Sequence, residues 1–117
     1  MPAIERVPGS ARGRSQASAW GDLVWAVATG PDKSGSVYDQ TRGALGVIDE
    51  CLSKSGTDKS RLVSATVYVT DIAAKGEMDR AWCEWIGDDP GHWPQRACIG
   101  VQLAPGDLVE IVVTAAR

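Results

Sequence analysis

The feature that most constrains the fold is an eight-residue stretch, residues 63–70, in which apolar and polar side chains alternate strictly. One face carries Val63, Ala65, Val67 and Val69, and the other carries Ser64, Thr66, Tyr68 and Thr70. Successive side chains of a β-strand point to opposite faces, so this pattern predicts a strand with one face buried under a helix layer. The other face is β-branched and half polar. It is typical of a surface that meets another sheet, although an exposed threonine-rich face fits equally well.

Two amphipathic helices are predicted to supply that layer. Residues 37–55 have Ser36 placed to cap the first turn and Asp39 to reciprocate, and Gly56 stands where a left-handed stop is expected. Their apolar stripe recurs at helical spacing and consists of Ala44, Leu45, Ile48, Cys51 and Leu52. Asp71 is predicted to cap a second helix over residues 73–86. Its stripe of Met78, Ala81, Trp82 and Trp85 indicates core packing rather than a cofactor site.

The remaining apolar runs are short and predict strands. Residues 3–7 read as an edge strand, and residues 17–27 as a hairpin around a Gly-Asp turn. Residues 97–103 and 108–113 are predicted to be joined by a second hairpin through Ala-Pro-Gly-Asp. The order β, β, β, α, β, α, β, β predicts an α+β fold, with two helices packed on one face of a mixed sheet. The chain, residues 1–117, is expected to form one domain whose open face is covered by self-association.

Bulk composition narrows the classes of function. The formal charge is -3 and the pI is near 5.0, which argues against a nucleic-acid partner because no basic field faces the phosphates. Three scattered cysteines show no spacing suited to zinc and fit a reducing compartment. No apolar run approaches the roughly 20 residues that a membrane span needs. A cytoplasmic protein without membrane contact is therefore expected.

Two charges interrupt the apolar pattern and mark a candidate site. Arg96 follows the rigid Pro94 where a loop enters a strand, and its guanidinium matches a carboxylate with two parallel donors. Glu110 lies inside the most hydrophobic run, where a carboxylate is costly unless it is paired, and it could hold or activate a water as a general base. The structural alternatives are a salt bridge from Arg96 to a neighbouring carboxylate, Glu110 included, and a Glu110 paired only for stability.

Two further residues are weaker candidates. Cys98 lies two residues beyond Arg96, on the same side of the strand, but no base stands near it in the sequence, which favours a packed, inert thiol. His92 is the only histidine and reads as a loop or interface residue. No Walker-type loop, Ser/His/Asp set or metal-ligand cluster is present in the sequence. With these classes of site excluded, the remaining chemistry is the binding of an anion beside a water molecule that is held or activated for attack.

Five short stretches, in this order and spacing, are specific to one protein family: 15–17 (Ser-Gln-Ala), 39–41 (Asp-Gln-Thr), 59–71, 94–98 (Pro-Gln-Arg-Ala-Cys) and 108–111 (Leu-Val-Glu-Ile). By these stretches the chain resembles the YjgF/RidA (reactive intermediate deaminase) family over nearly its whole length. The resemblance implies a chorismate-mutase-like α+β fold, assembled as a homotrimer with sites in the clefts between subunits. It also implies cofactor-free and metal-free hydrolysis of enamine and imine acids, such as 2-aminoacrylate and its imine, to 2-keto acids and ammonia.

The same resemblance assigns roles to individual residues. It implies that Arg96 binds the substrate carboxylate, that Cys98 contributes its backbone, and that Glu110 holds the attacking water. Arg14, beside Ser15, stands where the family often has a tyrosine, and Ala28 stands where it has a glycine. These three residues are expected to touch the substrate of a divergent subgroup. The alternatives are a non-catalytic metabolite-binding or chaperone-like trimer and an endoribonuclease, the latter a poor fit to the acidic pI.

Overall fold

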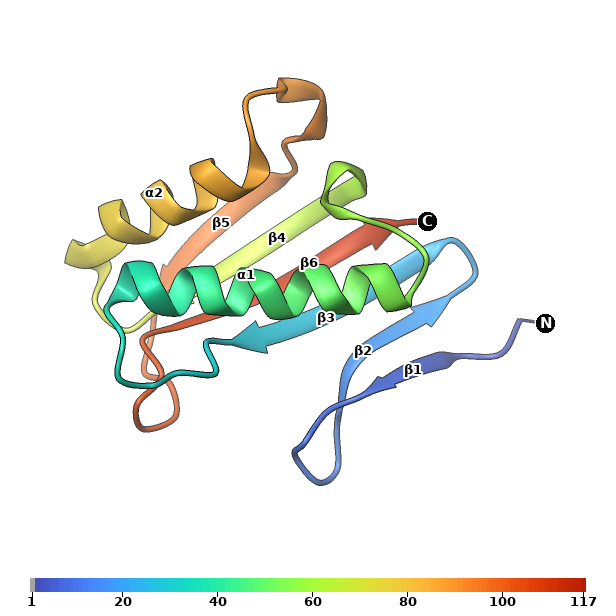
Figure 1. The fold of residues 1–117 in the computed structure, drawn as a ribbon, viewed down its shortest axis with the longest axis horizontal. Helices are drawn as coiled ribbons and strands as arrows, with labels where there is room; N and C mark the ends of the chain where they lie inside the picture. Colours follow the sequence, from blue (N-terminus) through green and yellow to red (C-terminus); the bar gives the residue numbers. More distant parts are fainter. Residues whose placement is uncertain (1) are drawn as a thin grey trace.

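The fold is a mixed sheet with two helices lying side by side on one face (Figure 1). The computed structural model describes residues 2–117, and in this range the six strands are β1 (Glu5–Pro8), β2 (Ser15–Trp20), β3 (Leu23–Thr29), β4 (Leu62–Val69), β5 (Gln95–Gly100) and β6 (Val109–Ala116). The helices are α1 (Val37–Lys54) and α2 (Lys75–Ile86), with 3₁₀ turns η1 (Lys59–Arg61), η2 (Ile72–Ala74) and η3 (Pro90–His92). The predicted α+β class and element order are confirmed.

The strand order is β1-β2-β3-β6-β4-β5, and only the β4–β5 pair is parallel. The first predicted hairpin is confirmed as β2 and β3, with Trp20 paired to Leu23. The predicted hairpin between the last two strands is wrong, because β4 lies between β5 and β6. The Ala-Pro-Gly-Asp turn does form, and Asp107 N–H donates to the Ala104 carbonyl at 3.0 Å. It belongs to a connection that carries the chain from the sheet edge back to the centre (Figure 1).

The first helix begins and ends where the sequence predicts. The capping box is present: Ser36 accepts from the backbone of Asp39, and Asp39 accepts from the backbone of Ser36. After the helix, Gly56 adopts φ +83°, the left-handed conformation that glycine reaches without strain. The buried side of α1 covers β3 and β6, and it includes two polar residues, Gln40 and Thr41.

The second helix ends at Ile86 as predicted, but it begins at Lys75 and not at residue 73. Asp71 caps the 3₁₀ turn η2 and not α2 itself, whose first residue follows Ala74 without a side-chain cap. At the other end Ile86 is buried, whereas Trp85 is only half-buried and faces the groove between the helices. The inserted 3₁₀ turn delays the start of α2, but the core position of Met78, Ala81 and Trp82 is confirmed.

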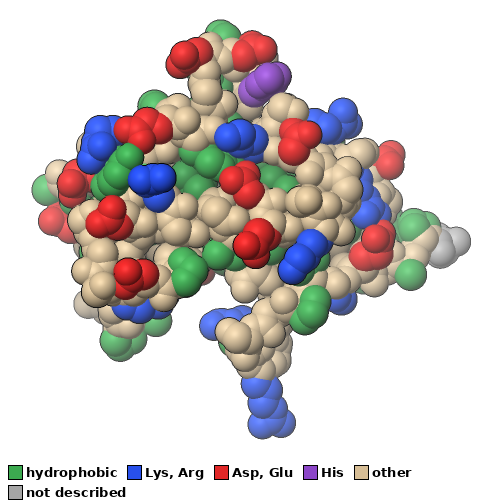
Figure 2. Space-filling model, viewed as in Figure 1, with side chains coloured by type: hydrophobic (Ala, Val, Ile, Leu, Met, Phe, Trp, Pro, Cys, Tyr) green, Lys and Arg blue, Asp and Glu red, His purple; other side chains and the backbone are tan. Residues whose placement is uncertain are grey.

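The two faces of the sheet differ in character. The core lies between the sheet and the helices and includes Val67, Ile111 and Val113. The prediction for Val63 is wrong: its side chain is 51% exposed, because a bulge between Leu62 and Ser64 shifts the register and Leu62 takes the buried place. The helix-covered outer surface carries acidic and basic side chains intermixed, as Figure 2 shows. Within residues 2–117, neither helix has the length and apolar character needed to cross a membrane.

Candidate functional site

Glu110 lies on the open face of the sheet, in a cavity of about 360 Å³. The walls come from the β1–β2 loop, the end of β3 and the loop before β6. Four of the six predicted site residues line this cavity: Arg14, Ser15, Ala28 and Glu110. In β6 the residues on either side of Glu110, Val109 and Ile111, point into the core, so alternation turns the carboxylate away from it. The apolar run therefore does not bury this charge.

Glu110 is a free acceptor in this cavity. Among residues 2–117 it has neither an ion pair nor a side-chain hydrogen bond. Asp107, which also lines the cavity, is neutralised by the ammonium of Lys33, and Lys33 Nζ donates in addition to Thr29 Oγ1 at 3.0 Å. The predicted structural pairing of Glu110 is thus absent from the described chain. A carboxylate with open lone pairs can hold a water and accept its proton.

Ala28 lines the same cavity through its backbone. Its methyl group is 1% exposed and packs in the core, on the side of the sheet that α1 covers. The open side of this part of β3 therefore carries no Cβ from residue 28. A small ligand can approach this peptide even though the chain has alanine at this position.

A buried amide joins the loop after β3 to the loop before β6, which lines the cavity. Gln40 is 1% exposed, and its Nε2 donates to the carbonyls of Gly106 at 3.0 Å and Lys33 at 3.3 Å. Its Oε1 accepts from Leu108 N–H at 2.9 Å. Sequence reasoning missed this residue. The available signal was a polar residue at position 40, four residues before Ala44 on the apolar stripe, since such a residue is buried only with its hydrogen bonds satisfied.

Arg96 lies on the other face of the sheet, beneath α2. Its partner in β4 is Ala65, a core residue, and its side chain is 18% exposed. Nη2 donates to Asp79 Oδ1 at 2.5 Å, Nη1 contacts Met78 Sδ at 3.6 Å, and Cζ lies 5.2 Å from the centroid of the Trp82 ring. Three of the five guanidinium N–H donors remain for a ligand. Arg96 lines a second cavity, of about 490 Å³.

Asp79 holds Arg96 in place and was missed by the sequence reasoning. Its carboxylate also accepts from Lys75 Nζ at 2.6 Å. Burial raises the pKa of Asp79, but the hydrogen bonds from Lys75 and Arg96 outweigh burial and hold the pKa below its ordinary value. The i, i+4 spacing of Lys75 and Asp79 was visible in the sequence, whereas the contact with Arg96 depends on how α2 crosses β5.

Cys98 is half-buried on the same face as Arg96 and packs against the core, as predicted for an inert thiol. Its strand, β5, is an edge strand, so the backbone groups along its free side have no partner strand within residues 2–117. The role of the Cys98 backbone in a site remains a prediction. His92 lies in the exposed turn η3, with Nε2 3.5 Å from Asp89 Oδ2.

One chain does not bring Arg96 and Glu110 together. They lie on opposite faces of the sheet, and β4 separates their strands. Adjacent strands are about 4.8 Å apart, so the axes of β5 and β6 are about 10 Å apart before the opposite directions of the side chains are counted. The structural alternative for Arg96, a salt bridge to a neighbouring carboxylate, is present, but its partner is Asp79 and not Glu110. The predicted site residues therefore fall into two groups on opposite faces of the sheet.

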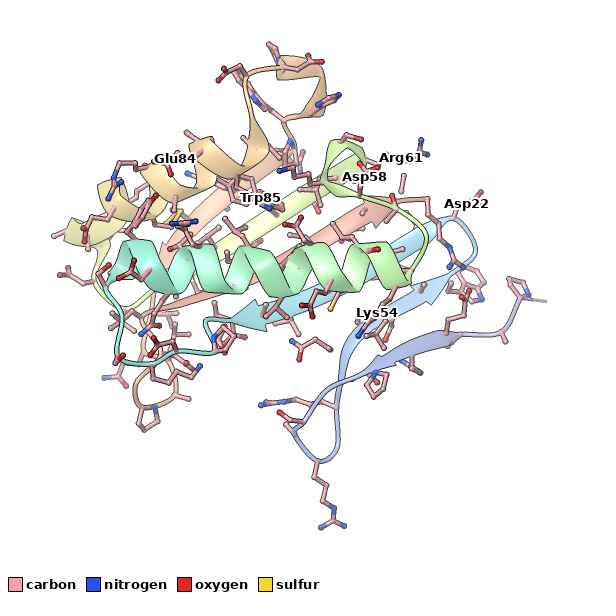
Figure 3. All side chains as sticks on the ribbon, in the orientation of Figure 1. Asp22, Lys54, Asp58, Arg61, Glu84 and Trp85 are labelled. Carbon is pink, nitrogen blue, oxygen red and sulfur yellow. The ribbon has the colours of Figure 1, made fainter. Side chains whose placement is uncertain are left out.

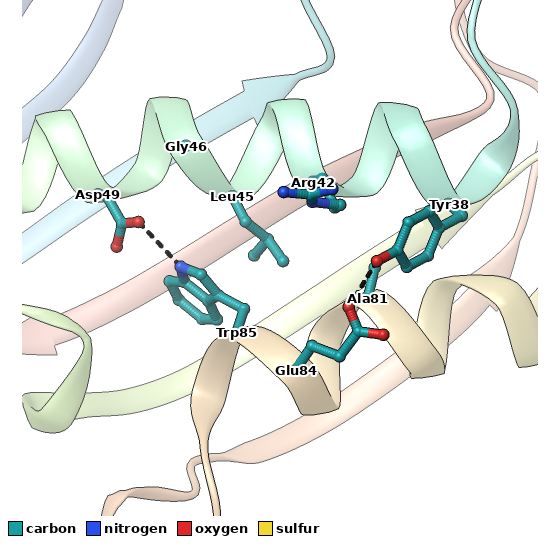
Figure 4. Close-up of a pocket in the computed structure, with 8 residues that line it drawn as sticks. All are labelled: Tyr38, Arg42, Leu45, Gly46, Asp49, Ala81, Glu84 and Trp85. Atoms are coloured by element: carbon teal, nitrogen blue, oxygen red, sulfur yellow. Dashed lines mark hydrogen bonds between the residues drawn. The ribbon is translucent and has the colours of Figure 1, made fainter.

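A third cavity, of about 400 Å³, lies in the groove between α1 and α2 (Figure 4). Its polar groups mainly bind one another: Tyr38 Oη donates to Glu84 at 2.5 Å, and Trp85 Nε1 donates to Asp49 at 3.0 Å. Figure 3 labels both α2 residues, Glu84 and Trp85, and Figure 4 draws their hydrogen bonds to α1. These contacts hold the two helices together, and the groups that make them are less available to bind or activate a ligand. No cluster of three metal-ligating side chains occurs in the described part of the chain.

Comparisons with known proteins agree on one family. A family model described as "Endoribonuclease L-PSP" matches residues 12–117. A RutC family protein from Haemophilus ducreyi is 50% identical over 86 residues, covering 73% of this chain and 72% of the relative. Another, from Haemophilus influenzae, is 34% identical over 115 residues, covering 96% and 97%. A solved YjgF family protein from Neisseria meningitidis superimposes with a TM-score of 0.89 at 30% identity, over 98% of this chain and 95% of that one.

Proposed function

Because the chain belongs to the family whose members are named YjgF, RutC and endoribonuclease L-PSP, we propose that it is a cofactor-free deaminase of enamine and imine acids. The products are a 2-keto acid and ammonia. The observation that carries the proposal is the complementary pair of half-sites, one with a fixed guanidinium and the other with an unpaired carboxylate.

Arg96 binds the substrate carboxylate in this proposal. The contact with Asp79 fixes one edge of the guanidinium, and Arg96 lines the cavity. A planar guanidinium that is already ordered loses little entropy when it grips an acid. The Trp82 ring beside it lowers the local polarity, which strengthens the charge-assisted bonds to the ligand.

Glu110 positions the attacking water and accepts a proton from it. The water oxygen forms a bond to the C=N carbon, and the π pair moves to nitrogen, which is protonated. The resulting carbinolamine then breaks its C–N bond and releases ammonia as the C=O bond forms. An enamine reaches the same path after protonation at carbon converts it to the imine. Because every step is a proton transfer, an addition or an elimination, without a change of oxidation state, two charged side chains and water suffice.

The two half-sites meet between copies of the chain in a homotrimer. The open face of the sheet carries exposed apolar side chains, Trp20, Leu23, Trp25 and Val112. A patch of this kind favours association. In the proposed assembly, the Glu110 cavity of one copy, with Arg14, Ser15 and Ala28, faces the β5 edge of its neighbour, where Arg96 and the Cys98 backbone lie.

The test is a coupled assay in which an amino-acid dehydratase or oxidase generates the imine and keto-acid release is followed. The protein is expected to accelerate release, and Arg96→Ala to reduce that effect. Loss of a charge-assisted contact costs about 2–5 kcal/mol, equivalent to roughly 30-fold to several thousand-fold in rate. Arg42→Ala is the matched control, because Arg42 lies in the groove between the helices. An Arg96→Ala rate equal to that of Arg42→Ala would sink the assignment.

The competing functions make different predictions in the same experiment. A metabolite-binding or chaperone-like trimer would bind carboxylates at Arg96 without turnover above the uncatalysed rate. The family description also names an endoribonuclease, but the net charge of -3 disfavours tight contact with RNA phosphates. RNA cleavage that is abolished by Glu110→Gln and persists through purification would favour that function instead.

A further inference from the structure

The cavity beside Arg96 is largely apolar. Besides Arg96 it is lined by Trp82, Ile86 and Trp93, with Cys83 on the exposed side of α2. Trp82 and Ile86 also belong to the core, so they form a firm floor. The volume of about 490 Å³ falls within the range of cavities that hold small organic ligands. It is larger than a two- or three-carbon acid needs.

Trp93 forms an outer wall of this cavity and is held from two sides. Its side chain is 54% exposed, and its Nε1 donates to the Gly87 carbonyl at 2.9 Å. Gly87 ends α2 at φ +81°, a conformation that favours glycine. The turn η3 before Trp93 is closed by Asp89, which accepts from Gly91 N–H at 2.9 Å. The hydrogen bond to Gly87 therefore orients the indole as an aromatic wall of the cavity that Arg96 also lines.

The charges of the cavity define the polarity of its ligand. Arg96 is the cationic group in its lining, and the carboxylate of Asp79 is already shared between Lys75 and Arg96. Asp88 is exposed and also lines the cavity, and it disfavours a second anionic group there. A ligand that matches this arrangement has one carboxylate at Arg96 and an uncharged apolar remainder against Trp93.

We propose that this cavity receives the substrate side chain, so that the protein selects imino acids with aromatic or branched apolar side chains over the alanine-sized imine. The inference rests on the proposed deaminase function and adds a specificity determinant to it. Trp93 contacts the side chain, and Trp82 and Ile86 form the floor. Arg96 binds the acid group and so fixes its position relative to the apolar surface of Trp93, Trp82 and Ile86.

The test compares kcat/KM for imines generated by an amino-acid oxidase from phenylalanine, leucine and alanine. The wild-type protein is expected to favour the two large imines. Trp93→Ala should lower the large-to-small ratio by at least about 10-fold, because each methylene-sized loss of apolar contact is worth about 10-fold or more. Trp93→Phe keeps an aromatic wall and should preserve the ratio within a few-fold. Glu50→Gln, on the exposed side of α1, is the control for effects of expressing and purifying a variant.

A second variant covers the case in which Trp93→Ala does not fold. Cys83→Phe adds bulk at the exposed wall of the cavity and should also lower the large-to-small ratio. An unchanged ratio in a folded variant, or a wild-type preference for the alanine-derived imine, overturns the specificity inference and leaves the deaminase function standing. Failure of the wild-type protein to accelerate hydrolysis of any imine overturns the proposed function itself.

Discussion

Replacing Gln40 by leucine is expected to destabilise the protein by about 2–4 kcal/mol, although leucine is close to glutamine in size. The amide makes three hydrogen bonds in a site that is 1% exposed. Each such bond contributes about 1 kcal/mol net, and the Leu108 N–H loses the acceptor that the amide supplies. Gained apolar contact offsets part of this cost.

The assay is thermal or urea unfolding at one fixed protein concentration, because assembly makes stability depend on concentration. For a chain of 117 residues the expected loss lowers Tm by about 8–16 °C. Gln102→Leu is the matched control, since Gln102 is exposed and makes no side-chain hydrogen bond among residues 2–117. A Gln40→Leu variant with the same Tm and urea midpoint as Gln102→Leu would refute the reasoning, because the loss of a buried amide with three hydrogen-bond partners should lower stability.

Further expectations follow from the ion pairs, the helix end and the bulge. Asp79→Asn should be less stable than wild type at pH 7, because the native pKa of Asp79 is lowered. The difference in free energy of unfolding between the two proteins should decrease as pH falls from about 4 through that pKa. Urea titrations at pH 7 and pH 3 would show this decrease. Gly87→Ala should cost about 1 kcal/mol in the same titrations, because a side chain is strained at φ +81°. Val63→Thr should change stability by less than about 0.5 kcal/mol, whereas Val67→Thr should cost about 1–3 kcal/mol by burying a hydroxyl. Equal losses for the two valine variants would contradict the bulge.

Local patterns in the sequence predicted most of the fold. The capping box before α1, the Gly-Asp turn between β2 and β3 and the alternation in β4 each depend on neighbours a few residues apart. The errors arose where a distant strand decides the outcome. The connection between β5 and β6 resembled a hairpin because no pattern within residues 97–113 indicates that β4 lies between those strands. The bulge that exposes Val63 depends likewise on the β6 register.

The sequence supplied candidate residues for a site, which remain predictions, but it did not supply their geometry. Arg14, Ser15, Ala28 and Glu110 do share a cavity, an arrangement that only the family resemblance suggested. The separation of Arg96 from Glu110 follows from sheet topology, so residue type and spacing could not reveal it. Sequence patterns do not predict ion-pair partners such as Asp79, because the angle at which a helix crosses the sheet determines which side chains meet.

The central claim, that each site takes its guanidinium from one copy and its carboxylate from another, is tested most directly by mixing two inactive variants. Arg96→Ala retains Glu110, and Glu110→Gln retains Arg96. In trimers formed from equal amounts by co-expression, each site has a one-in-two chance of an intact residue on either side, so activity should return to about a quarter of wild type. Mixtures no more active than the separate variants, in trimers shown to contain both chains, would contradict the account.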